Sequence, residues 1–191
     1  VGVSDRKPNF PEIGRFHKGA PKNAAGHVGR DLDYLRFASE DKAAEQALCD
    51  AYGKTPRAIN VFLPHVTIEE NWSAWKEEWS ASTLLHRCDG VRCVDWLENG
   101  ERRHVAAGGP LCPGGCKPTG RLRVLVVAGT RLLCNRLAYA TVETTSINDI
   151  LRLTEQLGAL FEAGKGSLRG IPLILSRGPV SITRKRVDSR S

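Results

Sequence analysis

The sequence has no methionine, few aromatic residues and no long apolar run, and these absences narrow the class of protein. Each apolar run falls short of the ~20 residues that cross a bilayer, so we expect no membrane-spanning helix. No basic segment followed by an apolar one opens the chain, so we expect a cytoplasmic protein rather than a secreted one. Because translation starts with methionine, we also expect the printed sequence to lack its start residue.

The common catalytic motifs are missing as well. Nothing matches a Gly-x-x-x-x-Gly-Lys-Ser/Thr phosphate loop, a Gly-x-Ser-x-Gly nucleophile turn or a His-Glu-x-x-His metal helix. Two carboxylate pairs, Glu69/Glu70 and Glu77/Glu78, fall in a segment with helical spacing, where we expect them to be solvated charges on the exposed face. We therefore predict a protein that is not an enzyme.

The overall composition favours a globular protein. The 191 residues are 41% hydrophobic and 26% charged, which is typical of a domain with a sizeable core. The formal net charge is +7, which permits contact with nucleic acid or an acidic partner but requires neither.

Four of the six cysteines form two close pairs. Cys88 and Cys93 bound one short segment, Cys112 and Cys116 bound another, and residues 94–111 separate the pairs. A structural zinc ion takes four soft ligands in a tetrahedron, and two cysteine pairs on tight turns can supply them. Glycines in both segments allow such turns. We therefore predict a zinc site made by these four cysteines.

The identity of the fourth ligand stays open at this point. His86 and His104 lie close enough in sequence to replace Cys93. Two disulfides, or unrelated buried thiols, are the other interpretations, but six cysteines in 191 residues is not the density of a disulfide-dependent domain. A zinc ion with four cysteine ligands has no open position for water, so the predicted site is structural.

Apolar periodicity predicts an α+β fold. The expected helices cover residues 39–52, 67–79 and 146–163, and the expected strands cover 13–19, 29–37, 58–63, 121–128, 137–144, 171–176 and 180–184. Between the cysteine pairs, Asn99-Gly100 predicts a hairpin turn joining strands over 91–97 and 101–106.

The order of these elements predicts a ferredoxin-like core. From residue 58 onward it is β-α-β-β-α-β, with a zinc-binding β-hairpin module inserted at about 84–118. We expect residues 1–57 to form a basic N-terminal arm and helix, and residues 58–191 to form the core. The alternative is another α+β arrangement in which the zinc module is a separate subdomain.

Three tryptophans mark the segment that follows Thr67. Trp72, Trp75 and Trp79 recur at helical spacing. Such a stripe is a core or a protein interface more often than a platform on which bases stack. We predict that these residues bind a partner protein.

Several short motifs follow one another in order along most of the chain. They are Ile13-Gly14-Arg15, residues 29–37 (GRDLDYLRF), Ala51-Tyr52-Gly53, Arg87-Cys88-Asp89-Gly90, Cys112-Pro113, residues 116–122 (CKPTGRL), residues 142–146 (VETTS) and Lys185-Arg186. The ordered set resembles the phage recombination directionality factors that partner large serine integrases. The resemblance implies a non-catalytic accessory protein of a bacterial or phage-infected cell. Such a factor binds a large serine integrase on DNA and switches it from integration to excision.

A second function stays open beside this one. A ferredoxin-like core with a protruding zinc hairpin is similar to RNA-recognition folds and to the repeat-associated subunits that coat guide RNA. A zinc-containing RNA- or DNA-binding subunit of this kind would use basic residues as phosphate contacts, namely Arg121, Arg123, Arg184, Lys185 and Arg186. The expected strands lack the paired aromatic residues of an RNA-recognition motif, which favours the integrase partner.

Overall fold

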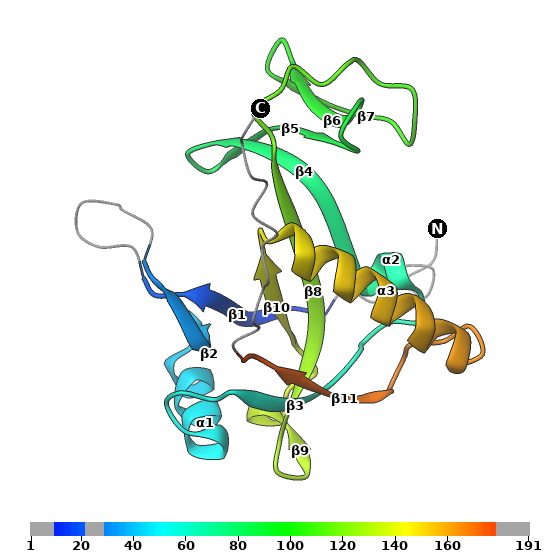
Figure 1. Cartoon of the computed structure of the whole chain (residues 1–191). Helices are drawn as coiled ribbons and strands as arrows, with labels where there is room; N and C mark the ends of the chain where they lie inside the picture. Colours follow the sequence, from blue (N-terminus) through cyan, green and yellow to red (C-terminus); the bar gives the residue numbers. More distant parts are fainter. Residues whose placement is uncertain (1–9, 22–28, 179–191) are drawn as a thin grey trace, which may run out of the picture.

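A computed structural model of the chain describes residues 10–21 and 29–178. This part of the protein is a mixed α+β structure made mostly of sheet, which confirms the predicted class (Figure 1). The strands are β1 (Glu12–Gly19), β2 (Asp31–Ala38), β3 (Ala58–Phe62), β4 (Trp72–Ser80), β5 (Thr83–Cys88), β6 (Cys93–Glu98), β7 (Glu101–His104), β8 (Lys117–Ala128), β9 (Arg131–Leu132), β10 (Tyr139–Thr144) and β11 (Pro172–Ser176). The helices are α1 (Lys42–Tyr52), α2 (Ile68–Asn71) and α3 (Ile147–Ala163), and η2 (Leu133–Asn135) is a short 3-10 turn.

Strand β8 organises the sheet. It runs through the middle of the molecule and pairs with β10, β4, β3 and β9 (Figure 1). The main path is β2-β1-β10-β8-β4-β5-β6-β7, and β11 joins through β3. Because side chains alternate along a strand, Leu122, Val124 and Val126 are buried while Arg121 and Arg123 lie on the opposite face.

Helix α3 packs on the apolar face of this sheet. The Trp72 indole Nε1 donates a hydrogen bond of 3.0 Å to Thr154 Oγ1 of α3. Gly120 of β8 lies directly below this contact, where an added Cβ would collide with the Trp72 ring and approach Ile150 Cγ1 to 3.0 Å. The absence of a side chain at Gly120 therefore lets helix and sheet come together.

The two longer helices begin and end close to the expected positions. Ser146 caps α3 by accepting from the Asp149 N–H, and Gly164 follows its last turn. Helix α1 ends at Gly53 as expected, but its cap is Asp41, whose carboxylate accepts from the Ala43 N–H, and not Ser39. The expected strand over 180–184 lies outside the described residues.

The helix expected over 67–79 is wrong after its first turn. Thr67 and Glu70 do form the capping box that starts α2, but Trp72 already has extended dihedral angles and opens β4. The sequence from Trp72 to Glu77 pairs in register with β8, and sheet pairing outweighs the helical spacing of the tryptophans. The glutamates at 77 and 78 therefore lie on a strand, not on an exposed helix.

The ferredoxin-like order is not found in the described part of the chain. The four strands of the expected core lie side by side in the order β11-β3-β8-β10. The first of them along the chain, β3, therefore pairs with the second, β8, whereas in a split β-α-β unit the first strand along the chain pairs with the third. With only one turn of helix in α2, nothing crosses the sheet between β3 and β4. Strands β1 and β2 extend the same sheet through parallel pairing of β1 with β10.

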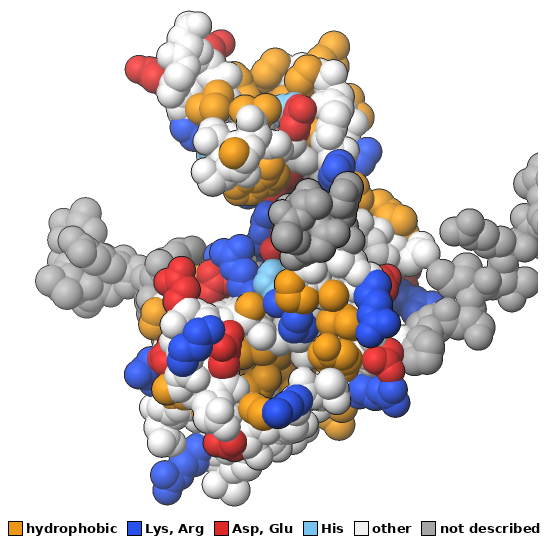
Figure 2. Space-filling view, turned by 90° about the vertical axis from the view of Figure 1, so that its left-hand side faces the viewer, with side chains coloured by type: hydrophobic (Ala, Val, Ile, Leu, Met, Phe, Trp, Pro, Cys, Tyr) orange, Lys and Arg blue, Asp and Glu red, His pale blue; other side chains and the backbone are white. Residues whose placement is uncertain are grey.

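Residues 76–117, which we call the arm, rise from the rest of the protein, which we call the body. Strand β4 curves upward to β5, β6 and β7, and the chain returns along the start of β8 (Figure 1). Figure 2 shows the arm as a separate lobe above the body. No helix in residues 10–21 and 29–178 is long and apolar enough to span a membrane.

Candidate metal centre

The first cysteine pair lies on a tight turn between two strands of the arm. Cys88 ends β5 and Cys93 begins β6, and the two residues are cross-strand partners. The Asp89 carboxylate accepts from the N–H groups of Val91 and Arg92 at 2.7 and 2.8 Å, and Gly90 has a φ of 116°. This side-chain turn holds the two cysteines at the same end of the hairpin.

The next hairpin has the predicted turn. Asn99 and Gly100 join β6 to β7 with φ values of 53° and 82°, which match the left-handed pair of a type I′ turn.

Strand β5, which the sequence analysis did not predict, pairs with both β4 and β6.

Backbone hydrogen bonds bring the second cysteine pair over the first. The Cys93 N–H donates to the Pro110 carbonyl at 2.9 Å, and the Cys112 N–H donates to the Val91 carbonyl at 2.8 Å. Gly114 and Gly115 both have positive φ, so the chain turns sharply between Cys112 and Cys116. The return loop therefore folds back onto the β5–β6 turn.

Three cysteines and a histidine converge inside the arm. The Cys116 sulfur lies 3.4 Å from that of Cys88 and 3.5 Å from that of Cys112. The Nε2 atom of His86 lies 3.0 Å from the Cys116 sulfur and 3.5 Å from the Cys112 sulfur. The ligand atoms of His86, Cys112 and Cys116 all lie within 4.8 Å of one another, so this group could hold a metal ion. All six cysteines of the chain are free thiols, which does not support a disulfide framework.

The environment shifts the pKa values of these thiols in different directions. Burial raises the pKa of Cys112, but hydrogen bonds from the Gly114 backbone, the neighbouring thiols and His86 outweigh burial and lower it to about 7. Burial and the neighbouring thiols raise the pKa of Cys116 well above its usual range. Metal binding to such a group would replace protons on the sulfurs, because the thiolate is the ligand.

The other two candidate ligands, Cys93 and His104, differ in how close they lie to this cluster. Cys93 is buried beside Cys88, and burial followed by charge on Cys112 and Cys88 raises its pKa. Its side chain contacts Cys112, but none of the contacts of 3.5 Å or less that join His86, Cys88, Cys112 and Cys116 in the described ranges involves Cys93. His104 is exposed on β7, outside the cluster.

A buried ion pair lies where the arm meets the body. The Glu77 carboxylate is inaccessible to solvent and accepts hydrogen bonds from Arg121 at 2.9 and 2.7 Å and from Arg87 at 2.9 Å. The Trp79 indole N–H donates to the same carboxylate at 3.0 Å. Burial raises the pKa of Glu77, but these hydrogen bonds outweigh burial and the net pKa is lowered.

Two expectations about this region are wrong. Glu77 is buried, not a solvated surface charge, because two guanidinium groups neutralise it. The tryptophans do not form one stripe: Trp72 is buried under α3, Trp75 is half-buried, and Trp79 is 47% exposed. The burial of Glu77 could have been predicted only if residues 72–80 had been assigned to a strand between the strands that carry Arg87 and Arg121. The predicted helix concealed this arrangement.

Two of the five predicted phosphate contacts, Arg121 and Arg123, have partners within the protein. Arg121 binds Glu77 and lies over the Trp79 ring at 5.8 Å, while the Arg123 guanidinium lies 5.2 Å from the Tyr139 ring. Both arginines also line a pocket that holds several carboxylates. The other three predicted contacts, Arg184, Lys185 and Arg186, lie outside the described residues.

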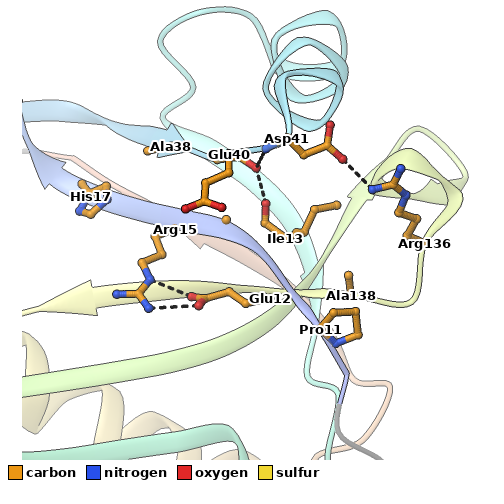
Figure 3. A pocket seen from close by; sticks show the side chains of 12 residues that line it. Pro11, Glu12, Ile13, Arg15, His17, Ala38, Glu40, Asp41, Arg136 and Ala138 are labelled. Carbon is orange, nitrogen blue, oxygen red and sulfur yellow. Dashed lines mark hydrogen bonds and ion pairs between the residues drawn. The ribbon is translucent and has the colours of Figure 1, made fainter.

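A pocket of about 740 Å³ lies beside α1 and β1 (Figure 3). Two ion pairs lie in its wall, Arg15–Glu12 at 2.9 Å and Arg136–Asp41 at 2.6 Å (Figure 3). Burial lowers the pKa of His17, which also lines the pocket. Its cations and carboxylates largely neutralise one another, so the pocket does not define one class of charged ligand.

The sequence matches the model of a known protein family. The model of the Gp3-like family, described as recombination directionality factor-like, matches residues 13–190. The chain therefore belongs to the Gp3-like, recombination directionality factor-like family. Neither the curated proteins nor the solved structures contain a significant match to it.

Proposed function

We propose that this protein is a non-catalytic accessory factor that binds a large serine integrase on DNA and switches it from integration to excision. The single observation that carries the proposal is the family match, which spans residues 13–190 and so includes both the body and the arm. It identifies a recombination accessory factor, and the partner and the direction of the switch are the proposed part.

Such a switch needs binding energy and no chemistry. An accessory factor changes the direction of a reaction when it binds two integrase–DNA assemblies with different affinities. A 100-fold change in their relative stability corresponds to about 2.7 kcal/mol of differential binding. A few anchored apolar side chains at an interface can supply this free energy.

We further propose that the arm binds a structural zinc ion through Cys88, Cys112, Cys116 and a fourth ligand. The predicted set of four included Cys93. A closed tetrahedral site holds the loop containing Cys112 and Cys116 against the β5–β6 turn and leaves no position for a reacting water molecule. The zinc ion would therefore shape the arm that the integrase meets.

The arm also carries the exposed apolar residues that we propose as integrase contacts. Val91 and Leu111 are 65% and 68% exposed, and they lie together because β-bridge pairing joins Arg92 to Leu111. Trp79 lies on the part of β4 that belongs to the arm, and the half-buried Trp75 lies on β4 just before the arm begins. Trp72 is excluded from this surface because α3 covers it.

A recombination assay tests the switch directly. The integrase encoded nearest to this gene is incubated with its two starting sites or its two product sites, with and without this protein. We expect the protein to promote recombination between product sites and to suppress it between starting sites. Unchanged recombination with both site pairs would overturn the proposal.

A matched pair of variants tests the contact surface in the same assay. We expect L111A to weaken integrase binding at least about tenfold, the effect of losing about 1.4 kcal/mol at an interface. Ile174→Ala removes an equally exposed aliphatic side chain, from β11 in the body, and serves as the control. Equal binding by the two variants would place the contact elsewhere.

The alternative function is a nucleic-acid-binding subunit. Tight, salt-sensitive binding of this protein to nucleic acid without integrase would favour it over the integrase partner.

A further inference from the structure

We infer that His86, and not Cys93, is the fourth metal ligand beside Cys88, Cys112 and Cys116, and that Glu78 positions its imidazole. The inference rests on the proposal that the arm binds zinc and is independent of the integrase. It converts the predicted four-cysteine site into a site with three sulfurs and one nitrogen.

Four distances within the cluster are close to the edges of a metal tetrahedron. Zinc–sulfur bonds of about 2.3 Å and a zinc–nitrogen bond of about 2.0–2.1 Å give sulfur–sulfur edges of about 3.8 Å and nitrogen–sulfur edges of about 3.6 Å. The two sulfur–sulfur contacts are 3.4 and 3.5 Å, and the His86 Nε2–sulfur contacts are 3.0 and 3.5 Å. Each contact is shorter than its ideal edge, the His86–Cys116 contact by about 0.6 Å and the others by less, so binding requires the four side chains to move apart around the ion.

The His86 ring is oriented for this role by its other nitrogen. His86 and Glu78 are cross-strand partners on β5 and β4, and His86 Nδ1 lies 3.4 Å from the Glu78 carboxylate. A carboxylate at Nδ1 favours a proton there and leaves the Nε2 lone pair directed at the three sulfurs. Metal-binding histidines commonly donate their second nitrogen to a carboxylate in this way.

The turn between Cys112 and Cys116 makes room for the same carboxylate. A Cβ atom on Gly115 would approach Glu78 Oε1 to 2.9 Å, which is closer than such contacts occur. The Glu78 side chain therefore lies between the imidazole that it orients and the turn that carries two ligands. A β-bulge between Arg87 and Cys88 changes the strand register where the ligands converge.

Cys93 has a packing role in this arrangement. Its side chain is buried, and its backbone N–H holds the return loop through Pro110. Its sulfur contacts Cys112, but it takes no part in the contacts of 3.5 Å or less that join His86, Cys88, Cys112 and Cys116 within the described ranges. A buried cysteine of this kind behaves as a small apolar residue.

X-ray absorption spectroscopy of the zinc-loaded, full-length protein counts the ligands. We expect three sulfurs at about 2.3 Å and one nitrogen at about 2.0–2.1 Å. Four sulfurs would overturn this inference while leaving the zinc proposal intact, and no stoichiometric metal would overturn both. Neither outcome depends on recombination activity.

Variants separate the two candidate ligands. C93S should keep one zinc ion and the same three-sulfur, one-nitrogen signal, while H86N should lose the nitrogen signal and bind zinc at least about tenfold more weakly. Because H86N could also unfold the arm, H86C is the rescue: we expect it to bind zinc through four sulfurs. Loss of zinc in C93S, with tight binding kept in H86N, would assign the fourth position to Cys93.

Glu78 is tested by its effect on the ring that it orients. E78Q should lower zinc affinity about 10–100-fold in competition with a chelator and shift the ¹⁵N resonances of the His86 ring, with coordination unchanged. E98Q alters another glutamate of the arm, which pairs with Arg103 in solvent, and should change neither. If E78Q changes neither the zinc affinity nor the ¹⁵N resonances of the His86 ring, Glu78 does not orient that ring.

Discussion

The body and the arm are stabilised by different interactions. In the body, β1, β3, β8, β10, α1 and α3 contribute to one continuous core that includes Phe16, Ile59, Val124 and Leu157. The described residues of the arm add none of the buried members of this core. Its own buried residues are chiefly polar or sulfur-bearing, namely Glu77, His86, Cys88 and Cys93, with Val94.

This difference fits the zinc site that we propose for the arm. A segment of this size cannot bury enough apolar surface to offset its conformational entropy, and small structures of this kind use metals or disulfides instead. The body has a continuous apolar core, and such burial stabilises a fold by ~25 cal/mol for each Å² removed from water. Metal loss should therefore affect the two regions unequally.

Removal of the metal should have the largest effect. Structural zinc contributes about 10–16 kcal/mol in zinc-finger peptides, so a chelator or C116S should unfold residues 83–116 and leave the body folded. Hydrogen exchange followed by mass spectrometry measures this: amides of β5, β6 and β7 should lose protection, while those of β8 and β10 keep it. C49S alters a cysteine of α1 and should change neither region. Equal loss of protection in the body and the arm would refute their independence.

Breaking the Glu77 ion pair should have an intermediate effect, at the junction of the two regions. E77Q takes away the carboxylate that binds Arg121 and leaves Arg87 with the more distant Asp95 carboxylate at 3.8 Å. We expect it to cost about 2–3 kcal/mol, below the about 3–5 kcal/mol of a fully buried pair, because both guanidiniums are partly exposed. Chemical denaturation measures this loss. E98Q, which alters a solvent-exposed pair, should stay within about 0.5 kcal/mol of the unchanged protein.

The Glu77 contribution should depend on pH in a defined direction. Its pKa in the folded protein is lowered, so its stabilisation is complete above the unfolded value of about 4.3 and is lost as pH falls through the folded pKa. The stability difference between the unchanged protein and E77Q should therefore shrink between pH 7 and pH 3. A difference that grows in acid would contradict the ion pair.

Two glycine substitutions within the body should give the smallest effects, with opposite signs. In G120A the new methyl group meets Trp72 and Ile150, and we expect a loss of about 1–2 kcal/mol from overpacking. Gly158 of α3 has no atom near an added Cβ, so G158A should gain about 0.5–1 kcal/mol from helix propensity. Thermal unfolding of both variants measures the contrast, and metal content should not change in either. Stabilisation by G120A would contradict the close packing of α3 on β8.

Local signals in the sequence predicted several elements correctly. Asn99-Gly100 predicted its hairpin, Ser146 and Gly164 marked the ends of α3, and the apolar run from residue 58 predicted β3. The paired cysteines marked the arm as a candidate metal site. These signals worked because caps and tight turns depend on neighbouring residues.

The failures came from contacts between distant residues. The tryptophan spacing in residues 72–79 predicted a helix, but pairing with β8, forty to fifty positions away, makes a strand there. The same pairing brings Arg121 to Glu77, and the pairing of β4 with β5 brings Arg87 to Glu77 and sets Glu78 beside His86. Local propensity is a weak guide where a long-range sheet partner decides the outcome.

The sequence by itself determined the α+β class, most helix and strand positions, the family of the protein and the cysteines from which a metal site could be built. Only the tertiary structure decided the strand order, the separation of arm from body, the burial of Trp72 and Glu77, and the approach of His86 to the cysteines. The physical reason is that turns and caps are encoded by adjacent residues, while pairing and burial depend on where the chain places residues far apart in sequence.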